Sequence, residues 1–176
     1  MSSWFVFHVQ TGREQTVCDF LNKLLNNEES IAFIPQVELI FKNSRSVRKE
    51  LRPMFPGYVF TDSELDERAF VTQAYRYVRF SPSIFKLLGN QSMDYMKLSE
   101  DEKNYLLSFY DDKYIVEESK GFIVGDKIVI NSGALKGKES IIKKIDRHKR
   151  CAEIEMVWFG ELRRISVALE IVSKIK

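Results

Sequence analysis

The chain changes character after Gly121, and this change constrains the fold more than any other feature. Helical and strand patterns alternate before it, whereas residues 122–176 carry only strand patterns, five short ones in about fifty residues. An open sheet of that size would leave its edges free to pair with other chains. We therefore expect residues 122–176 to form a small closed β-barrel.

A period-two pattern indicates which side chains face the core of this barrel. Along one strand the residues Ala152, Ile154, Met156 and Trp158 alternate with Glu153, Glu155, Val157 and Phe159. We expect the first set to face the core and Phe159, on the face of the two glutamates, to be exposed. An exposed aromatic residue at a strand end is a reasonable contact for a partner. The alternative is that a local bulge turns Phe159 inward.

Residues 1–110 mix strand and helix patterns. Strand patterns cover Trp4–Gln10, Ile31–Phe41, Tyr58–Thr61 and Val78–Phe80. Helical patterns follow two capping boxes, Thr11–Glu14 and Ser99–Glu102, and also cover Ser63–Tyr75. The resulting order, β-α-β-β-α-β-α, predicts an α+β fold of the ferredoxin-like kind. Its helices would lie on one face of a mostly antiparallel sheet.

Two local features refine the second strand of this order. Pro35 lies inside the pattern Ile31–Phe41, which indicates an edge strand or a bulged one. The basic stretch Lys42–Arg52 follows, and Asn43-Ser44 within it is typical of a turn. We therefore expect a hairpin tip with a basic surface between the second and third strands.

Charge is distributed unevenly along the chain. Residues 1–121 carry 15 Lys or Arg against 18 Asp or Glu, whereas residues 122–176 carry 12 against 7. The excess points to a nucleic acid or another acidic partner for the C-terminal part, and a basic solvated face is the alternative. The acidic, weakly periodic stretch 111–121 indicates a linker. We therefore predict domains at 1–110 and 122–176.

The sequence gives no support for an enzyme. His8 lies in a strand pattern and is interpreted as structural, and His148 lies in a basic turn between Arg147 and Lys149. No glycine-rich phosphate loop and no nucleophile–base pair is present. Cys18 and Cys151 are too far apart to give metal-ligand spacing or a disulfide framework. We expect a non-enzymatic protein without cofactor or metal.

Nothing in the sequence indicates a membrane or an export route. The apolar run Trp4–Phe7 is too short for a signal peptide and is followed by His8. No stretch approaches the ~18 apolar residues of a membrane span. A cytoplasmic protein is expected.

Two motifs indicate the function of the protein. Met54-Phe55-Pro56-Gly57-Tyr58-Val59-Phe60 places a Pro-Gly turn between aromatic residues, which fixes a sharp entry into a strand. The second motif runs from Gly125-Asp126 to Gly133-Ala134-Leu135-Lys136-Gly137. Together with Trp4 and the order of the two domains, these motifs resemble the NusG family of transcription elongation factors over nearly the whole chain.

This resemblance implies a fold, partners and contact residues. Residues 1–110 would form an NGN-type domain that binds RNA polymerase and lies near non-template DNA, and residues 122–176 an SH3-like barrel with a KOW motif. The residues that match the polymerase surface are Trp4, Phe55 and Tyr58; the alternative is that Phe55 and Tyr58 are ordinary core residues. The barrel would recruit a further partner, such as a ribosomal protein, through the loop that contains Phe159.

The sequence also departs from the common form of the family. The second helix lacks a match to the Asn-Thr pair that some relatives use on DNA, and the barrel loop reads Phe159-Gly160-Glu161-Leu162-Arg163-Arg164. These differences resemble a specialised paralogue similar to LoaP, an antiterminator of chosen operons. A housekeeping elongation factor and a ribosome-associated RNA-binding KOW protein without polymerase contact are the alternatives.

Basic residues of the barrel are the candidates for binding RNA. They cluster in three places: Lys136 and Lys138; Arg147, His148, Lys149 and Arg150; and Arg163 and Arg164. The loops of a small barrel share one or two ends, so these groups could converge on one face. Arginine contacts phosphates and stacks on unpaired bases, which favours nascent RNA with a loop or bulge. A solvated charged rim is the alternative.

Overall fold

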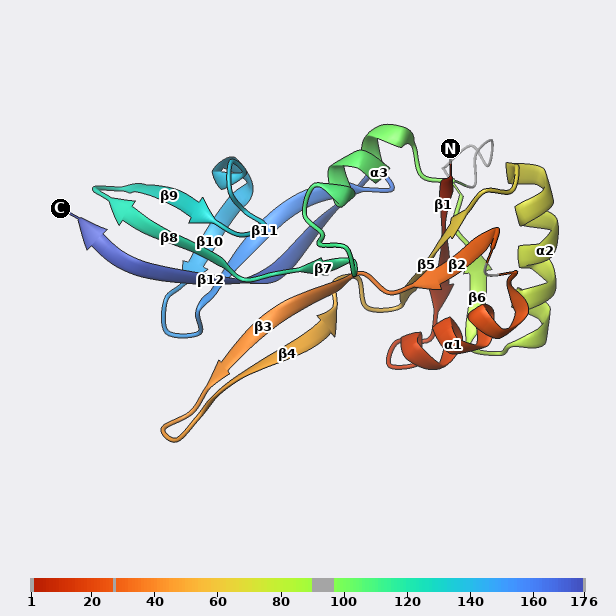
Figure 1. The fold of residues 1–176 in the computed structure, drawn as a ribbon, viewed down its shortest axis with the longest axis horizontal. Coiled ribbons are helices and arrows are strands. Elements are labelled where there is room, and N and C mark those ends of the chain that lie inside the picture. The colour runs from red at the N-terminus through yellow and green to blue at the C-terminus, as the bar shows by residue number, and fades with distance from the viewer. Residues whose placement is uncertain (1, 27, 90–96, 176) are drawn as a thin grey trace. The chain divides into compact units, whose positions relative to one another are not determined.

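Two groups of residues make up the fold. The computed structural model describes residues 2–26, 28–89 and 97–175. Unit 1 contains Met1–Pro35 and Phe55–Asn104, and unit 2 contains Gln36–Met54 and Tyr105–Lys176. The class is mixed α+β, with three α-helices and several sheets in the described residues (Figure 1). Because residues 36–54 group with unit 2, this division differs from the domain boundaries at 110 and 122, which stay a prediction.

A four-stranded antiparallel sheet forms the centre of unit 1 (Figure 1). Its strands, in spatial order, are β2 (Ser30–Phe33), β5 (Tyr58–Ser63), β1 (Ser3–Val9) and β6 (Ile84–Leu87). The helices are α1 (Glu14–Leu24), α2 (Glu67–Phe80) and α3 (Glu100–Leu107), the last of which runs across the sequence boundary between the units. β1 pairs with β5 on one side and β6 on the other, so its side chains have neighbours on both flanks.

The core of unit 1 lies between this sheet and two helices. Alternate residues of β1, Phe5, Phe7 and Val9, are fully buried and point to the helices. Phe5 stacks on Phe70 of α2 with 4.0 Å between ring centroids, and Leu21 of α1 joins the same cluster. Both α1 and α2 therefore cover one face of the sheet, and Trp4, Val6 and His8 of β1 lie on the other.

The start of α1 differs from the expected capping box. Glu14 does not cap its own helix: its carboxylate accepts the backbone N–H of Gly12 at 2.8 Å and that of Gly57 at 2.8 Å. The side chain of the N-cap residue of α1, Arg13, makes no capping hydrogen bond. Gly57 has φ +86°, and an added Cβ would lie 3.1 Å from Oγ1 of Thr11. The buried carboxylate thus joins the first turn of α1 to the strand entry at Pro56-Gly57.

Two other local expectations are wrong, and one is confirmed. The expected strand Ile31–Phe41 is two strands of different sheets, because Pro35 offers no N–H and interrupts pairing between β2 and β3 (Gln36–Lys42). The expected strand Val78–Phe80 is the last turn of α2. The box at Ser99 and Glu102 is confirmed, since each backbone N–H donates to the other side chain at 3.2 Å.

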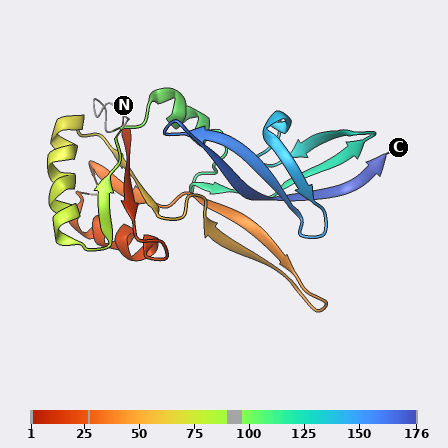
Figure 2. The same ribbon diagram turned by 180° about the vertical axis from the view of Figure 1, so that it is seen from behind.

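Two sheets make up unit 2 (Figure 2). The smaller has the order β4 (Val47–Pro53), β3, β7 (Ile115–Val116). The larger has the order β10 (Ile142–Asp146), β11 (Cys151–Trp158), β12 (Glu161–Ile175), β8 (Ser119–Val124), β9 (Lys127–Ser132), with the short 3₁₀ helix η1 (Glu139–Ile141) before β10. The segment expected as a linker, 111–121, therefore contains β7 and the first three residues of β8.

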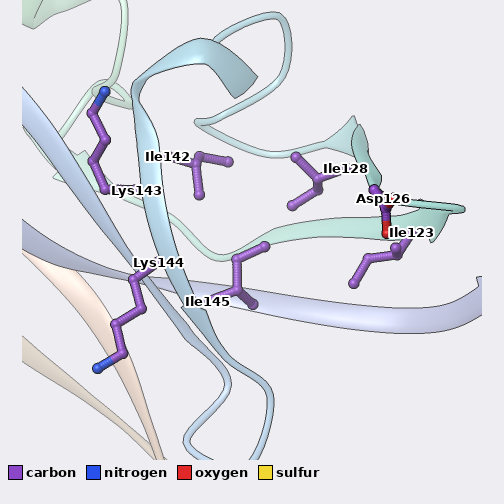
Figure 3. A pocket seen from close by; sticks show the side chains of 7 residues that line it. All are labelled: Ile123, Asp126, Ile128, Ile142, Lys143, Lys144 and Ile145. Carbon is purple, nitrogen blue, oxygen red and sulfur yellow. The ribbon is translucent and has the colours of Figure 1, made fainter.

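Within the described residues, the larger sheet curls but is not closed into a barrel by hydrogen bonds between its two edge strands. Its two edge strands are β9 and β10, and no ladder joins them among the described residues. A pocket between these edges is lined by Ile123, Ile128, Ile142 and Ile145 together with Asp126, Lys143 and Lys144 (Figure 3). Glu139 of η1 accepts the N–H of Ile130 of β9 at 3.1 Å. Side-chain contacts, not a strand ladder, thus occupy the place where the expected barrel would close.

The loop Gly133–Gly137 is tight, as its glycines predict. Gly133 has φ +92°, and an added Cβ would lie 2.4 Å from the carbonyl oxygen of Glu118. The close approach allows the N–H of Leu135 to donate to Oγ of Ser119 at 2.9 Å, and Leu135 is fully buried. This loop therefore packs against β8 instead of projecting into solvent.

We predict that Glu14→Gln lowers the free energy of unfolding of unit 1 by about 2–3 kcal/mol, because a buried N–H loses its charged acceptor. Urea unfolding followed by the fluorescence of Trp4, in a Trp158→Phe background, measures it. The exposed Glu64→Gln is the matched control and should change stability by less than about 0.5 kcal/mol. Equal urea midpoints for Glu14→Gln and the parent would contradict the role of this carboxylate.

Candidate functional site

Two of the three aromatic residues that match the family's contact surface are buried. Trp4 is 1% exposed and Phe55 is 4% exposed. Their rings join an aromatic cluster on the face of the sheet opposite the helices: Trp4 lies 5.0 Å from Phe33 and 6.0 Å from Phe60, and Phe55 lies 5.8 Å from Phe60, all between centroids. In this conformation, packing alone accounts for Trp4 and Phe55. Their binding role stays a prediction.

Tyr58, the third of these residues, belongs to a more exposed ring group. Its ring stacks on His8 at 5.2 Å and 25° between planes, and His8 meets Phe85 edge-on at 5.2 Å. Phe85, on β6, is 54% exposed, and the other two rings are half-buried. We call Tyr58, His8 and Phe85 the ring group.

Sequence reasoning missed two members of the ring group. His8 was expected to be structural, and β6 was not expected at all. The four residues of β6 are in turn buried, exposed, exposed and buried, so no period-two pattern in the sequence marks Phe85. Phe85 comes close to His8 only because β6 pairs with β1, where His8 pairs in register with Lys86.

The turn between β10 and β11 presents the densest basic run of unit 2. Arg147, His148 and Lys149 are exposed, and Arg150, at φ +51°, closes the turn. The carboxylate of Asp146 accepts the N–H of Lys149 at 2.9 Å, and this bond holds the pKa of Asp146 below its usual value. The turn is therefore ordered by its own backbone, with Arg147, His148 and Lys149 exposed and Arg150 paired with Glu170 at 3.4 Å.

The other basic candidates do not all converge on this turn. The turn Asp146–Arg150 lies at one end of the eight-residue strand β11, whereas Arg163 and Arg164 pair with Met156 and Glu155 near its other end. At ~3.3 Å per residue, the two ends are roughly 25 Å apart. The expected convergence of all three clusters is wrong because a hairpin has two ends.

Several of these cations are already engaged within unit 2. Arg163 reaches Glu161 at 2.6 Å, and Arg164 reaches Glu155 at 2.9 Å. Lys138 donates to the carbonyl of Ser108 at 3.0 Å and lies 4.8 Å from the ring centroid of Phe109. Lys136 is exposed on the same loop. The β10–β11 turn is therefore the strongest candidate for contact with an anionic partner.

Phe159, the candidate partner contact, is half-buried. It has φ +49° in the turn after β11, and its ring meets Trp158 edge-on at 5.1 Å. The inward set Ala152, Ile154, Met156 and Trp158 is buried, as the alternation predicts. Beside Phe159, the cross-strand pair Val157 and Leu162 is 61% exposed at each residue. Sequence reasoning placed Val157 on the outer face but gave it no role.

The described residues contain no group of three or more His, Cys, Asp and Glu side chains placed to hold a metal ion. No helix within the described ranges is long and apolar enough to cross a membrane. The candidate sites are the ring group in unit 1 and the basic turn in unit 2.

The two cysteines should differ in reactivity. Burial, assisted by the charge of Asp19, raises the pKa of Cys18 to about 11, so at pH 8 only about one thiol in a thousand is ionised. Burial also raises the pKa of Cys151, which is half-buried.

We expect a maleimide to label Cys151 first, and the labelling of Cys18 to accelerate about tenfold per pH unit between pH 8 and pH 10. Mass spectrometry of the labelled peptides checks this. Equal rates at pH 8 would contradict it.

Comparison with known proteins places the chain in a family. The family model described as transcription termination factor nusG matches residues 2–107. The transcription termination/antitermination protein NusG of Chlamydia trachomatis is 24% identical over 166 residues, which cover 94% of this chain and 90% of the relative. The protein of the same name from Thermus thermophilus is 23% identical and covers 98% of this chain and 97% of its own.

A solved structure agrees with the fold. The structure titled "Domain interaction in Thermotoga maritima NusG" has a TM-score of 0.53 and 22% identity, and the match covers 97% of this chain and 94% of that chain. The family model spans more than half of the described residues, including the strand β5 that follows the Pro-Gly turn. The chain therefore belongs to the NusG family of transcription termination factors, whose members are non-enzymatic transcription factors.

Proposed function

We propose that this protein is a transcription elongation and antitermination factor that binds RNA polymerase through residues 1–110 and nascent RNA through its basic C-terminal part. Membership of the NusG family over residues 2–107 is the observation that carries the proposal. The first region would be an NGN-type domain and residues 122–176 an SH3-like KOW barrel. The order β10-β11-β12-β8-β9 and its curled edges support the second assignment.

The polymerase surface would be centred on the ring group. Tyr58 follows Gly57 directly, and the bond from Gly57 to buried Glu14 fixes where Tyr58 enters β5. Phe85 supplies exposed apolar area beside it. Aromatic side chains that bury large areas on binding are typical anchors of protein interfaces. Trp4 and Phe55 would then support this surface from within the aromatic cluster.

We predict that Tyr58→Ala and Phe85→Ala each weaken binding to purified RNA polymerase about thirtyfold, which corresponds to ~2 kcal/mol. Surface-immobilised polymerase measures the affinity, and circular dichroism verifies the fold. Tyr75→Ala is the matched control, because Tyr75 is 52% exposed on α2 and lies outside the ring group.

The buried Phe55 gives a second, separable result. Phe55→Ala should destabilise unit 1 by about 3–5 kcal/mol, because it leaves a cavity in the aromatic cluster. Folded Tyr58→Ala and Phe85→Ala proteins with unchanged affinity would remove the ring group from the polymerase surface.

RNA binding would be centred on the β10–β11 turn. With roughly four to six phosphates neutralised, the logarithm of the affinity should fall against the logarithm of salt with a slope of about −3 to −5. We expect Arg147→Glu with Lys149→Glu to weaken binding to all RNAs in a gel-shift series. Arg163→Glu with Arg164→Glu is the comparison and should have a smaller effect, because Glu161 and Glu155 already neutralise those arginines. A barrel surface that binds no RNA at low salt is only a charged rim.

A specialised, operon-targeted role, similar to that of LoaP, is the favoured form of this function. The arginines beside the β11–β12 turn and the lack of an Asn-Thr match in α2 support it. A housekeeping elongation factor would instead affect many genes, so transcript profiling of a deletion strain separates the two. A ribosome-associated protein without polymerase contact would fail to retain polymerase in a pull-down. Contacts of unit 1 with non-template DNA and of Phe159 with a ribosomal protein belong to the same proposal.

A further inference from the structure

Two basic segments that are far apart in the sequence lie side by side in unit 2. The first is the hairpin of β3 and β4, and the second is the turn between β10 and β11 (Figure 1, Figure 2). A pocket of about 430 Å³ lies between them. Its lining residues are Leu39, Ile40, Phe41, Lys42, His148, Lys149, Cys151 and Ser166. We call this pocket the hairpin cleft.

The hairpin cleft contains an aromatic ring within reach of arginines. Phe41 is 39% exposed near the end of β3. The guanidinium carbons of Arg48 and Arg52, on the paired strand β4, lie 5.7 and 5.8 Å from its ring centroid. An accessible ring next to guanidinium groups is the combination on which unpaired bases stack.

The hairpin beside the cleft is cationic, even after its ion pairs are counted. Residues 41–52 hold five Lys or Arg and one acid, Glu50, which pairs with Arg48 at 2.8 Å and Arg52 at 2.6 Å. Lys49 is held by Glu38 at 2.8 Å and Glu118 at 3.3 Å. Within the described residues, Lys42 and Lys149 make no ion pair, and both line the cleft. Such groups are suited to the phosphates on either side of a base.

The shape favours one unpaired nucleotide over a duplex. Leu39 and Ile40 give the cleft an apolar wall, and a pocket of a few hundred Å³ is the usual size for a small planar ligand. A base inside a helix keeps both faces stacked on its neighbours and cannot enter. Unpaired bases of loops and bulges are free to do so.

We propose that the hairpin cleft binds RNA by taking one unpaired base against Phe41, with Lys42 and Lys149 on the flanking phosphates. The proposal rests on the proposed binding of nascent RNA and adds two things. It makes the β3–β4 hairpin, not the C-terminal barrel alone, part of the site, and it assigns recognition to an unpaired base.

Fluorescence anisotropy of the full chain, with a labelled RNA hairpin that has an unpaired loop and with a blunt RNA duplex of equal length, tests the stacking. Phe41→Ala should weaken loop RNA about tenfold or more, Phe41→Tyr should retain binding, and the salt slope of Phe41→Ala should stay unchanged. Leu51→Ala is the matched control: Leu51 is 46% exposed on β4 and lies outside the cleft. Lys42→Gln with Lys149→Gln should make the salt slope about 2 units shallower.

Cys151 provides a readout that does not depend on affinity. It lines the hairpin cleft, so saturating loop RNA should slow its reaction with maleimide about tenfold or more, whereas blunt duplex should not. Cys18, buried in unit 1, is the internal control and should keep its slow rate.

The outcomes separate this proposal from the broader one. RNA binding could still depend on Arg147 and Lys149 while Phe41→Ala has no effect and Cys151 stays reactive. That result would overturn the proposed base site in the hairpin cleft and leave the proposed RNA binding by the turn intact. Absence of RNA binding at low salt would overturn both. Equal protection of Cys151 by polyglutamate would show a site for acidic protein segments, which would overturn the assignment to RNA.

Discussion

The buried carboxylate of Glu14 is the contact on which the geometry of unit 1 depends most. One oxygen accepts the N–H of Gly12, in the turn between β1 and α1, and the other accepts the N–H of Gly57, immediately before β5. β1 and β5 are the two central strands of the sheet. A single side chain therefore links the turn that follows β1 to the turn that precedes β5, next to His8 and Tyr58, which pair across the same two strands.

Local patterns were sufficient for elements whose partners are near in sequence. The strand at Trp4, the entry into β5 after Pro56-Gly57 and the box at Ser99 and Glu102 were all predictable, because turns and caps act over a few residues. The box expected at Thr11 failed for the opposite reason. Glu14 has the right spacing for a local cap, but one of its carboxylate oxygens accepts a hydrogen bond from the N–H of Gly57, 43 residues away.

Surfaces were harder to predict than elements, because they depend on which strands become neighbours. Trp4 and Phe55 have the aromatic character of contact residues, yet a cluster with Phe60 buries both. Phe85 gave no such signal in the sequence and becomes a surface ring only because β6 pairs with β1. Likewise, the basic segments of the hairpin cleft are about a hundred residues apart in the chain and meet through the packing of β3 on β12.

The place of the β3–β4 hairpin in the chain has a consequence for the order of folding. The hairpin is inserted between β2 and β5 of unit 1, yet it packs with strands from the last third of the sequence. During synthesis, the sheet of unit 1 can close once β6 has emerged, whereas the hairpin must wait for β12 at the end of the chain. For that interval the part of β3 that later packs on β12 is uncovered. A segment made early in synthesis is therefore completed only by the late C-terminal strands.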